Sequence, residues 1–270
     1  MITSPANSKI KHVSSLISSK KERTNTGTFV VEGTRMFLEA PIEDIAEVYI
    51  SDSFYDRLCG GDEYKLSDVM LDIYKKLKAT GYETVTDAIF KKMSDTVTPQ
   101  GILCVVKIKQ YDIADVVAQY KDLPIKAVAL EGLQDPGNMG TIVRTSEAAG
   151  INLILAGANT VDVYSSKVVR STMGSIFRVP IIYSNDLYRD IEYLKGQDVT
   201  VYAAHLKGVT SYRDVSYSKR SMILIGNEGA GLTDKATDMA DMLVKIPMEG
   251  QVESLNASIA AAILMFELSR

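Results

Sequence analysis

Short blocks of apolar residues alternate with amphipathic stretches along the whole chain, beginning in its first hundred residues. A polar, threonine-rich turn is expected at 23–28, and Asp87 is expected to cap a short helix. Apolar blocks typical of buried strands lie at 29–31, 47–50, 82–86 and 101–108. Helices are expected at 7–20, 34–40 and 66–79. Strands that alternate with helices predict a small α/β domain in this region.

A second alternation begins after a short connecting helix at 113–120 and the break at Leu123-Pro124. Its first block, 125–130, is apolar without interruption, which is typical of a strand covered on both faces. Later strands are expected at 151–155, 179–182, 199–204, 222–225 and 243–246. Helices are expected at 139–149, 165–176, 186–195, 232–239 and from 255 onward. The pattern predicts two α/β domains, 1–108 and 125–270, joined by a linker at 109–124.

Three loops at strand ends of the second domain are rich in glycine and polar residues: 131–140, 226–231 and 246–260. In open α/β sheets, ligands bind outside the carboxyl ends of the strands, and glycine lets the backbone approach a ligand closely. The chain has no phosphate-binding GxxxxGK pattern followed by Ser or Thr, and 226–231 lacks the glycine order of a dinucleotide fingerprint. The loops therefore predict a ligand site of another kind. For the third loop, the alternative is an ordinary helix cap at Ser254.

The composition is that of a soluble globular protein, with 46% apolar and 24% charged residues among 270. Its longest apolar runs, such as 221–225 and 260–266, are far too short to span a bilayer. The N-terminal sequence lacks the apolar core of a signal peptide, so we expect a cytoplasmic protein. Cys59 and Cys104 lie far apart, and His12 and His205 are the two histidines, so we expect neither a disulfide framework nor a metal site.

The net charge of −4 argues against non-specific wrapping of nucleic acid, but it says nothing about a local basic patch. One such patch lies in the first 23 residues, where the only acidic side chain is Glu22. Its basic residues are Lys9, Lys11, Lys20, Lys21 and Arg23. From charge alone, a solvated helix face is the first interpretation and an RNA contact the second.

The residues of the three loops resemble the SpoU family of RNA 2′-O-ribose methyltransferases, within the knotted SPOUT superfamily. The family motif N-x-G-x-I-x-R matches Asn138, Gly140, Ile142 and Arg144. The motif G-x-E-x-x-G-L matches Gly226, Glu228, Gly231 and Leu232. The motif I-P-M-x-G-x-x-x-S-L-N-x-S-x-A matches 246–260 without a gap. The segment between the first two motifs is also similar, at Arg170, Ser171, Gly174 and Pro180, so the resemblance covers about 125–270.

This resemblance implies features of the fold that periodicity does not reveal. The mostly parallel sheet of the second domain would contain a deep trefoil knot, against the general rule that chains do not thread loops. Two chains would form a homodimer whose active sites use residues of both. Residues 29–33, followed by Arg35, resemble the opening of the RNA substrate-binding domain that many members carry, an α/β fold similar to kink-turn-binding ribosomal proteins. This second resemblance favours an RNA contact for the basic N-terminal helix.

The methyl donor implied by the resemblance is S-adenosylmethionine. The positions that match the family's donor contacts are Gly226, Ile246, Met248 and Leu255, together with the backbone around His205. The loops can supply backbone donors and acceptors for the adenine and an apolar slot for the remainder. From periodicity alone, Ile246 and Leu255 would be ordinary core residues.

The acceptor implied by the resemblance is a ribose 2′-hydroxyl, a weak nucleophile that must lose a proton. Family proposals assign the removal of this proton to the arginine that matches Arg144. Because arginine is normally a permanent cation, Arg144 could instead hold an RNA phosphate and align the hydroxyl. Asn138 and Asn256 are expected to orient the arginine and the loops, Ser254 to orient the ribose, and Glu228 to pair with Arg144 within the chain or across a dimer. The alternatives are a helix cap for Asn138 and a favourable helix-dipole position for Glu228.

We therefore expect a cytoplasmic, homodimeric, S-adenosylmethionine-dependent RNA 2′-O-ribose methyltransferase that uses no metal. Ribosomal RNA is the expected substrate, because the opening of the N-terminal domain is similar to that of members that act on large-subunit rRNA. The alternatives are tRNA as the substrate and a catalytically inactive RNA-binding factor in ribosome assembly. A nicotinamide-dependent oxidoreductase is a more distant third.

Overall fold

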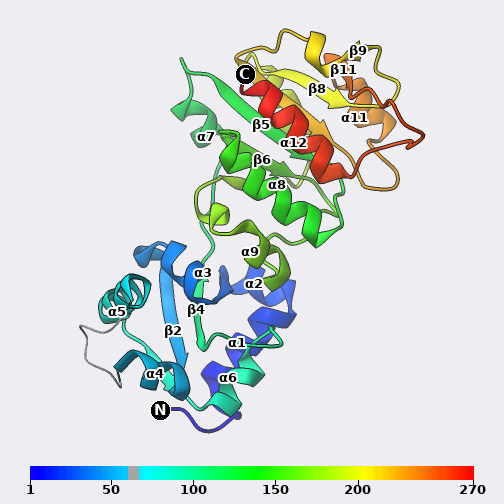
Figure 1. The fold of residues 1–270 in the computed structure, drawn as a ribbon. Helices are drawn as coiled ribbons and strands as arrows, with labels where there is room; N and C mark the ends of the chain where they lie inside the picture. Colours follow the sequence, from blue (N-terminus) through cyan, green and yellow to red (C-terminus); the bar gives the residue numbers. More distant parts are fainter. Residues whose placement is uncertain (60–66) are drawn as a thin grey trace. The chain divides into compact units, whose positions relative to one another are not determined.

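The computed structural model describes residues 1–59 and 67–270, which form two units. Unit 1 consists of Met1–Lys109 and Tyr164–Phe177, and unit 2 of Gln110–Val163 and Arg178–Arg270. Figure 1 traces the elements of both units. The predicted division at a single linker, 109–124, does not describe this arrangement. The chain leaves unit 2 after Val163, contributes Tyr164–Phe177 to unit 1, and continues in unit 2 from Arg178.

Unit 1 is built on a four-stranded sheet with the strand order β1-β4-β2-β3. Strand β4 runs antiparallel to β1 and β2, and β2 runs parallel to β3. The strands are β1 (Thr28–Glu32), β2 (Ile45–Ser51), β3 (Glu83–Val85) and β4 (Ile102–Lys107). The helices are α1 (Ser8–Ser18), α2 (Lys20–Thr26), α3 (Thr34–Glu39), α4 (Asp52–Cys59), α5 (Asp68–Thr80), α6 (Asp87–Met93) and α9 (Ser166–Thr172), with 3-10 turns η1 (Ile42–Asp44) and η3 (Ser175–Phe177). The small α/β domain predicted from the alternation is confirmed.

Helices cover both faces of the unit 1 sheet, which explains why its strands are apolar on both sides. On one face, α1 and α6 pack against the sheet through a buried cluster that includes Val13, Phe90 and Leu103. On the other face, α3 and α5 contact each other, and they also contact β4 and β2 respectively (Figure 1). The buried face of α1 carries its apolar residues Ile10, Val13 and Leu16.

The turn expected at 23–28 is wrong, because most of this segment belongs to helix α2. The side chain of Ser19 caps this helix, and Gly27 ends it in the left-handed conformation, with φ of 62°. Arg23 is only 5% exposed, and its guanidinium donates to backbone carbonyls in the last turn of α1. The sequence does not reveal that Arg23 is buried, because its burial results from the packing of α1 against α2.

The basic N-terminal cluster therefore presents fewer charges to a partner than its composition indicates. Lys9 forms an ion pair with Glu83, and Arg23 is buried between two helices. Lys11 on α1 and Lys20 and Lys21 on α2 are exposed. An RNA contact by this cluster would depend on these exposed lysines rather than on all of its basic residues.

Replacing Arg23 by alanine is expected to lower the free energy of unfolding by about 2–3 kcal/mol, because hydrogen bonds from a charged group contribute about 1.5–3 kcal/mol. The carbonyls of Leu16 and Ile17 would lose their guanidinium donor. Urea unfolding of the full-length protein measures the change. Lys21→Ala, at an exposed position two residues earlier, is the control and should cost less than about 0.5 kcal/mol. Equal losses in the two variants would contradict the structural role of Arg23.

Two further local predictions for unit 1 were incomplete. Helix α6 is capped by Thr86, whose hydroxyl accepts from the backbone N–H of Ile89 (3.4 Å), and not by Asp87. Asp87 is the first residue of the helix, and its carboxylate accepts from the hydroxyl of Ser53 (2.7 Å). Helix α4 was not predicted, since it follows β2 directly and no turn residues separate the two.

The helix α9 and the turn η3 pack against β1 inside unit 1. The ring of Phe29 lies 4.9 Å from that of Tyr164 and 6.3 Å from that of Phe177. The guanidinium of Arg170 donates twice to Oδ2 of Asp95, at 3.2 Å in each case. The family resemblance assigns Arg170 to the second domain, but the structure places it in unit 1, where it binds Asp95.

Unit 2 is built on a seven-stranded sheet with the strand order β7-β6-β5-β10-β8-β11-β9. All neighbouring strands in this order are parallel. The strands are β5 (Ile125–Leu130), β6 (Leu153–Ala156), β7 (Ile181–Tyr183), β8 (Thr200–Ala204), β9 (Thr210–Ser211), β10 (Arg220–Ile225) and β11 (Met242–Lys245). The mostly parallel sheet predicted for this part of the chain is confirmed. Strand β9 was not predicted, because two residues are too few to leave a pattern.

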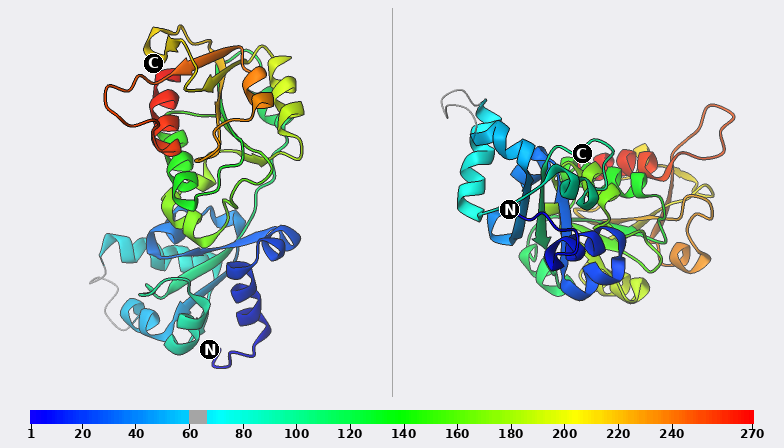
Figure 2. Two further views of the ribbon diagram at one scale, coloured as in Figure 1. Left: turned by 90° about the vertical axis from the view of Figure 1, so that its right-hand side faces the viewer. Right: turned by 90° about the horizontal axis from the view of Figure 1, so that it is seen from below.

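Helices lie on both faces of the unit 2 sheet. They are α7 (Ile113–Gln119), α8 (Pro136–Ala148), α10 (Leu187–Lys195), α11 (Asp234–Asp238) and α12 (Ala257–Leu268), with the 3-10 turn η4 (Tyr212–Asp214). The left view of Figure 2 shows the sheet between the pair α8 and α12 and the pair α10 and α11. Val116 and Val117 of α7 are buried in the same core as Ile191 and Leu194 of α10. The expected linking helix is thus part of the unit 2 core.

The strand order brings the glycine-rich loops to one edge of the sheet. Strand β10 lies between β5 and β8, and β8 lies between β10 and β11. Because these strands are parallel, the segments that follow all four begin at the same carboxyl edge. Within residues 1–59 and 67–270, no helix has the length and apolar character needed to cross a bilayer.

Candidate functional site

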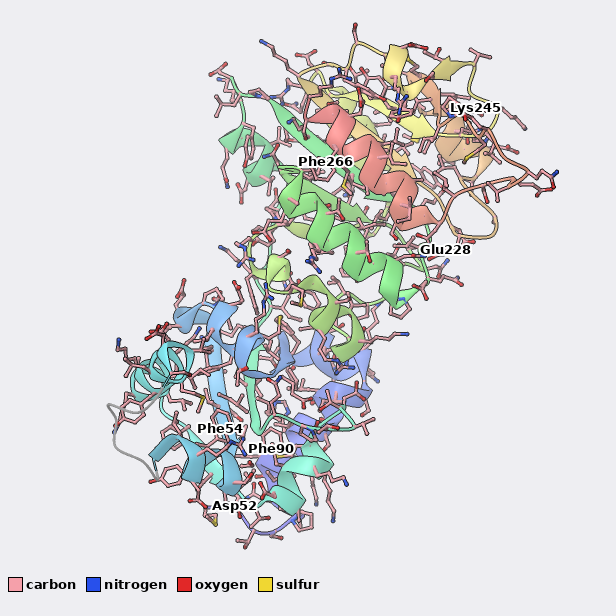
Figure 3. The ribbon with its side chains drawn as sticks, in the orientation of Figure 1. Asp52, Phe54, Phe90, Glu228, Lys245 and Phe266 are labelled. Carbon is pink, nitrogen blue, oxygen red and sulfur yellow. The ribbon has the colours of Figure 1, made fainter. Side chains whose placement is uncertain are left out.

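Side chains from the three glycine-rich loops form one hydrogen-bonded chain at the carboxyl edge of the unit 2 sheet. Oε1 of Glu228, in the loop after β10, accepts from Nδ2 of Asn138 at the start of α8 (3.0 Å). Oδ1 of Asn138 accepts from Nδ2 of Asn256, directly before α12 (2.8 Å). Figure 3 labels Glu228 beside the N-terminal ends of α8 and α12. The structure therefore joins three candidate residues that lie far apart in the sequence.

The carboxylate of Glu228 binds the start of α8, not Arg144 of the same chain. Its Oε2 accepts from the backbone N–H of Gln134 (3.1 Å) and its Oε1 from that of Asp135 (2.9 Å). Burial raises the pKa of Glu228, but the hydrogen bonds from Asn138 and from these backbone groups outweigh it and hold the pKa below its ordinary value. Within the chain, Glu228 thus stabilises a helix N-terminus. Pairing with Arg144 across a dimer stays a prediction.

The contribution of Glu228 to stability is expected to depend on pH. Because its pKa in the folded protein is lowered, the contribution is present above the ordinary pKa of 4.5 and is lost as the pH falls through the folded-state value. Glu228→Gln should therefore be less stable than the wild type at about pH 7, and this difference should shrink toward about pH 3. Thermal unfolding of both proteins across this range measures the difference. A gap that is independent of pH would show that the carboxylate is not bound in its ionised form.

Asn138 connects the other two residues of the hydrogen-bonded chain. It is 7% exposed, and both ends of its amide are used, Nδ2 by Glu228 and Oδ1 by Asn256. The cap of α8 is Asp135, whose Oδ1 accepts from the backbone N–H of Asn138 (2.8 Å). The alternative capping role for Asn138 is therefore wrong. Its side chain instead fixes the start of α8 to the loops after β10 and before α12.

The cap of α12 is Asn256, not Ser254. Oδ1 of Asn256 accepts from the backbone N–H and the hydroxyl of Ser258, at 2.9 and 2.7 Å. The same side chain thus ends one loop and contacts another through Asn138. Ser254 lies two residues before the cap and is exposed. Its expected role in orienting a ribose stays a prediction.

Arg144 lies on the exposed side of α8. Ile142 and Val143, which are fully buried, hold this part of the helix on the sheet. The side chain of Arg144 is exposed, and in the described part of the chain its guanidinium has no hydrogen-bond or ion-pair partner. The N–H groups of its guanidinium are therefore available to bind an anionic group through two parallel hydrogen bonds.

The loop after β10 folds back so closely that its first position accepts only glycine. Asn227 and Gly231 exchange two backbone hydrogen bonds, of 3.0 and 2.9 Å. A Cβ atom on Gly226 would lie 2.2 Å from the carbonyl carbon of Gly231. Oδ1 of Asn227 accepts from the backbone N–H groups of Gly229 (2.9 Å) and Ala230 (3.0 Å). These bonds fix the shape of the loop.

Three of the candidate donor-binding residues follow adjacent strands. His205 follows β8, Gly226 follows β10 and Ile246 follows β11, with β8 between the other two strands. The backbone N–H of His205 donates to the carbonyl of Val244 in β11 (3.0 Å). Nδ1 of its imidazole accepts from the backbone N–H of Lys207 (3.1 Å). The structure therefore aligns these three residues along one edge of the sheet.

Apolar side chains beside this edge keep part of their surface open. Ile246, Met248 and Leu255 are half-buried, whereas Val244 in β11 is 1% exposed. Complete burial in the core, the alternative for Ile246 and Leu255, therefore does not apply. Partly open apolar side chains next to closely folded backbone fit S-adenosylmethionine, whose adenine needs backbone donors and acceptors and whose methionine chain needs apolar contact.

Two residues that shape the site were not identified from the sequence. Asn227 fixes the loop after β10, and Asp135 caps α8. Both precede a glycine within two residues, and such Asn and Asp side chains commonly bind backbone N–H groups in turns, so this signal could have identified them. Among residues 1–59 and 67–270, no three His, Cys, Asp or Glu side chains are grouped as metal ligands would be.

Two family models match the chain. The SpoU rRNA Methylase family matches residues 126–266, which include all three loops of the site. The MRM3-like substrate binding domain matches residues 7–104, which include β1, β2, β3 and the first half of β4.

Individual proteins are similar over nearly the whole length. The 23S rRNA (guanosine(2553)-2'-O)-methyltransferase RlmP of Bacillus subtilis (strain 168) is 31% identical over 268 residues, which are 99% of this chain and 98% of that protein. The structure of an AdoMet-bound rRNA methyltransferase from Sinorhizobium meliloti has a TM-score of 0.77 at 29% identity and covers 99% of this chain and 96% of that chain. The SpoU methyltransferase AviRb from Streptomyces viridochromogenes has a TM-score of 0.80 at 23% identity, covers 97% of this chain and 96% of that chain, and is similar in fold.

Proposed function

The chain belongs to the SpoU rRNA methylase family, and we therefore propose that it transfers a methyl group from S-adenosylmethionine to a ribose 2′-hydroxyl of ribosomal RNA. The observation that carries this proposal is the hydrogen-bonded chain Glu228–Asn138–Asn256, which joins all three family motifs at one edge of the sheet. The rRNA substrate is supported by the 23S rRNA methyltransferase that matches the chain from end to end.

The methyl donor would be held at the ends of β8, β10 and β11. Bound S-adenosylmethionine supplies an electrophilic methyl group on a sulfonium. The backbone at Gly226 and at His205 would form hydrogen bonds with the polar groups of the donor. Its apolar groups would contact Ile246, Met248 and Leu255. Its binding here is supported by the AdoMet-bound rRNA methyltransferase of similar fold and 29% identity.

Arg144 would act on the acceptor. Its exposed guanidinium is suited to hold an RNA phosphate by two parallel hydrogen bonds and so align the 2′-hydroxyl with the methyl group. It would also stand close to the proton that the hydroxyl loses. Asn138 and Glu228 hold the helix that carries Arg144, and Ser254 would bind the ribose from the loop before α12.

Unit 1 would bind the RNA. This role is supported by the match of residues 7–104 to a substrate binding domain. The proposed similarity to kink-turn-binding ribosomal proteins agrees with a mixed sheet covered by helices on both faces. Lys11 and Lys21 are exposed cations of the N-terminal cluster and would contact phosphates. A cytoplasmic location would be consistent with an rRNA substrate.

A trefoil knot and a homodimer complete the proposal. The knot is supported by the path of the chain, since β10 is inserted between β5 and β8, and the chain returns after β11 to α12, which packs on α8 and β10. The dimer is supported by α12, where Ile259 is 49% exposed and Phe266 54% exposed (Figure 3). A helix that is apolar all round is normally covered, and a second copy would cover this one. Light scattering of the purified protein tests the dimer.

Mapping of 2′-O-methylated riboses in cells with and without this protein tests the function. We expect one site to be lost from 23S rRNA and to be restored in vitro by the purified protein with S-adenosylmethionine. A loss confined to tRNA would support the tRNA alternative. If no site is lost from either RNA, the proposed activity is wrong. If calorimetry also detects no binding of S-adenosylmethionine, an inactive RNA-binding factor becomes the better interpretation.

A further inference from the structure

Glu131, the first residue after β5, holds both sides of the glycine loop that follows β10. Its backbone N–H donates to the carbonyl of Ile225, the last residue of β10 (2.9 Å). Its carboxylate reaches the other side of the loop at Thr233. Oε2 accepts from the backbone N–H of Thr233 (2.9 Å) and Oε1 from its hydroxyl (2.8 Å). The loop is therefore tied to a single residue where it begins and where it ends.

A third donor completes the coordination of this carboxylate. The hydroxyl of Tyr188, on α10, donates to Oε1 of Glu131 (2.6 Å). This bond raises the pKa of Tyr188, so the tyrosine keeps the proton that it donates. The ammonium of Lys235 lies 3.9 Å from the centre of the Tyr188 ring, a cation–π contact that helps to hold the ring. Glu131 thus connects the loop to both α10 and the start of α11.

The position of Gly226 depends on the segment that Glu131 holds. Gly226 lies directly against the backbone of Gly231 and Leu232, and Thr233 is the next residue. Displacement of Thr233 would move this segment and open the contact that shapes the loop. Three hydrogen bonds direct the carboxylate of Glu131 toward Thr233 and Tyr188, so its effect on a ligand would pass through the loop.

We propose that Glu131 is a positioning residue for the methyl donor. This inference rests on the proposed function, in which Gly226 contacts S-adenosylmethionine. By fixing the exit of the loop at Thr233, the carboxylate holds the backbone of Gly226 in the conformation that binds the donor. Glutamine has a similar shape, but it offers one acceptor oxygen and turns N–H groups toward the remaining donors.

Full-length Glu131→Gln tests the proposal through the separate affinities for donor and RNA. We expect the Kd and KM for S-adenosylmethionine to rise about tenfold, since bonds to a charged acceptor are lost. The KM for RNA and the kcat at saturating donor should stay within about threefold of the wild type. Tyr188→Phe removes one of the three donors and should raise the donor Kd by a smaller factor. Glu131→Asp, which keeps the charge, should recover part of the affinity.

The outcomes separate this inference from the proposed function. If the wild type does not bind S-adenosylmethionine in calorimetry, the proposed function fails and the inference falls with it. If the wild type binds and folded Glu131→Gln binds with unchanged affinity, only the inference is wrong. A lower melting temperature with unchanged donor affinity would likewise assign Glu131 a purely structural role and overturn the inference. Should Glu131→Gln fail to fold, Tyr188→Phe decides the question, and unchanged donor affinity in that variant overturns the inference.

Discussion

Replacement of Arg144 by alanine is expected to lower the turnover number at least about 100-fold, because a positioned proton acceptor contributes about 10²–10⁴-fold and alignment of a reacting group contributes further. The Kd for S-adenosylmethionine should stay within about threefold of the wild type. Arg144 is exposed on α8, whereas the candidate donor-binding residues lie at the ends of β8, β10 and β11. Steady-state methylation of 23S rRNA at saturating substrate and calorimetry with the donor measure the two quantities.

A matched control for this variant is Arg189→Ala. Arg189 lies on α10, on the opposite face of the sheet, and its side chain is 78% exposed. The control removes the same charge and the same side chain, so it separates a local effect from a change in overall RNA attraction. It should retain nearly full turnover. If Arg144→Ala lost the binding of S-adenosylmethionine, neither of the roles considered for Arg144 would stand.

Arg144→Lys distinguishes two contributions of the guanidinium. Lysine keeps the positive charge but lacks the planar fork that binds a phosphate through two parallel hydrogen bonds. If alignment through the phosphate predominates, the lysine variant should lose most of the turnover that the alanine variant loses. If attraction by charge alone predominates, lysine should restore activity to within about tenfold of the wild type.

The parallel sheet and the meeting of the three loops could be predicted because both follow from local patterns. Uninterrupted apolar runs such as 125–130 indicate strands covered on both faces, and the carboxyl ends of parallel strands share one edge. The hydrogen-bond partners were harder to predict. Glu228 has Arg144 and the start of α8 as competing partners, and only the three-dimensional position of Asn138 and of two backbone N–H groups decides between them.

Other features depend on long-range packing that leaves no periodic signal. The burial of Arg23 results from the packing of α2 on α1, and in the sequence this residue looks like any other member of a basic cluster. The segment around α9 has the helical pattern expected of unit 2, yet the ring of Tyr164 contacts that of Phe29 within unit 1. Glu131 belongs to none of the three family motifs. Its role in holding the loop after β10 is visible only in the structure, where Thr233 and Tyr188 donate to its carboxylate.

Gly226→Ala is expected to weaken the binding of S-adenosylmethionine at least about 100-fold, which corresponds to about 2.7 kcal/mol. The added Cβ would lie 2.2 Å from the carbonyl carbon of Gly231 and 2.3 Å from the backbone nitrogen of Leu232, distances that no repacking of side chains can relieve. The backbone must separate, and the two hydrogen bonds between Asn227 and Gly231 would be lost with it. Calorimetry with the donor and circular dichroism of the folded variant measure binding and fold.

Gly229→Ala, in the same loop, is the matched control. A Cβ on Gly229 meets only Oδ1 of Asn227, at 3.7 Å, which is an ordinary contact, and its backbone does not adopt a positive φ. This variant should bind the donor with nearly wild-type affinity. The comparison therefore isolates the close backbone approach at Gly226 from the general effect of adding a methyl group to the loop. If Gly226→Ala folds and binds the donor as tightly as Gly229→Ala does, the loop after β10 is not part of the donor site. The proposed arrangement, with the donor at the ends of β8, β10 and β11 and the acceptor at Arg144, would then be wrong.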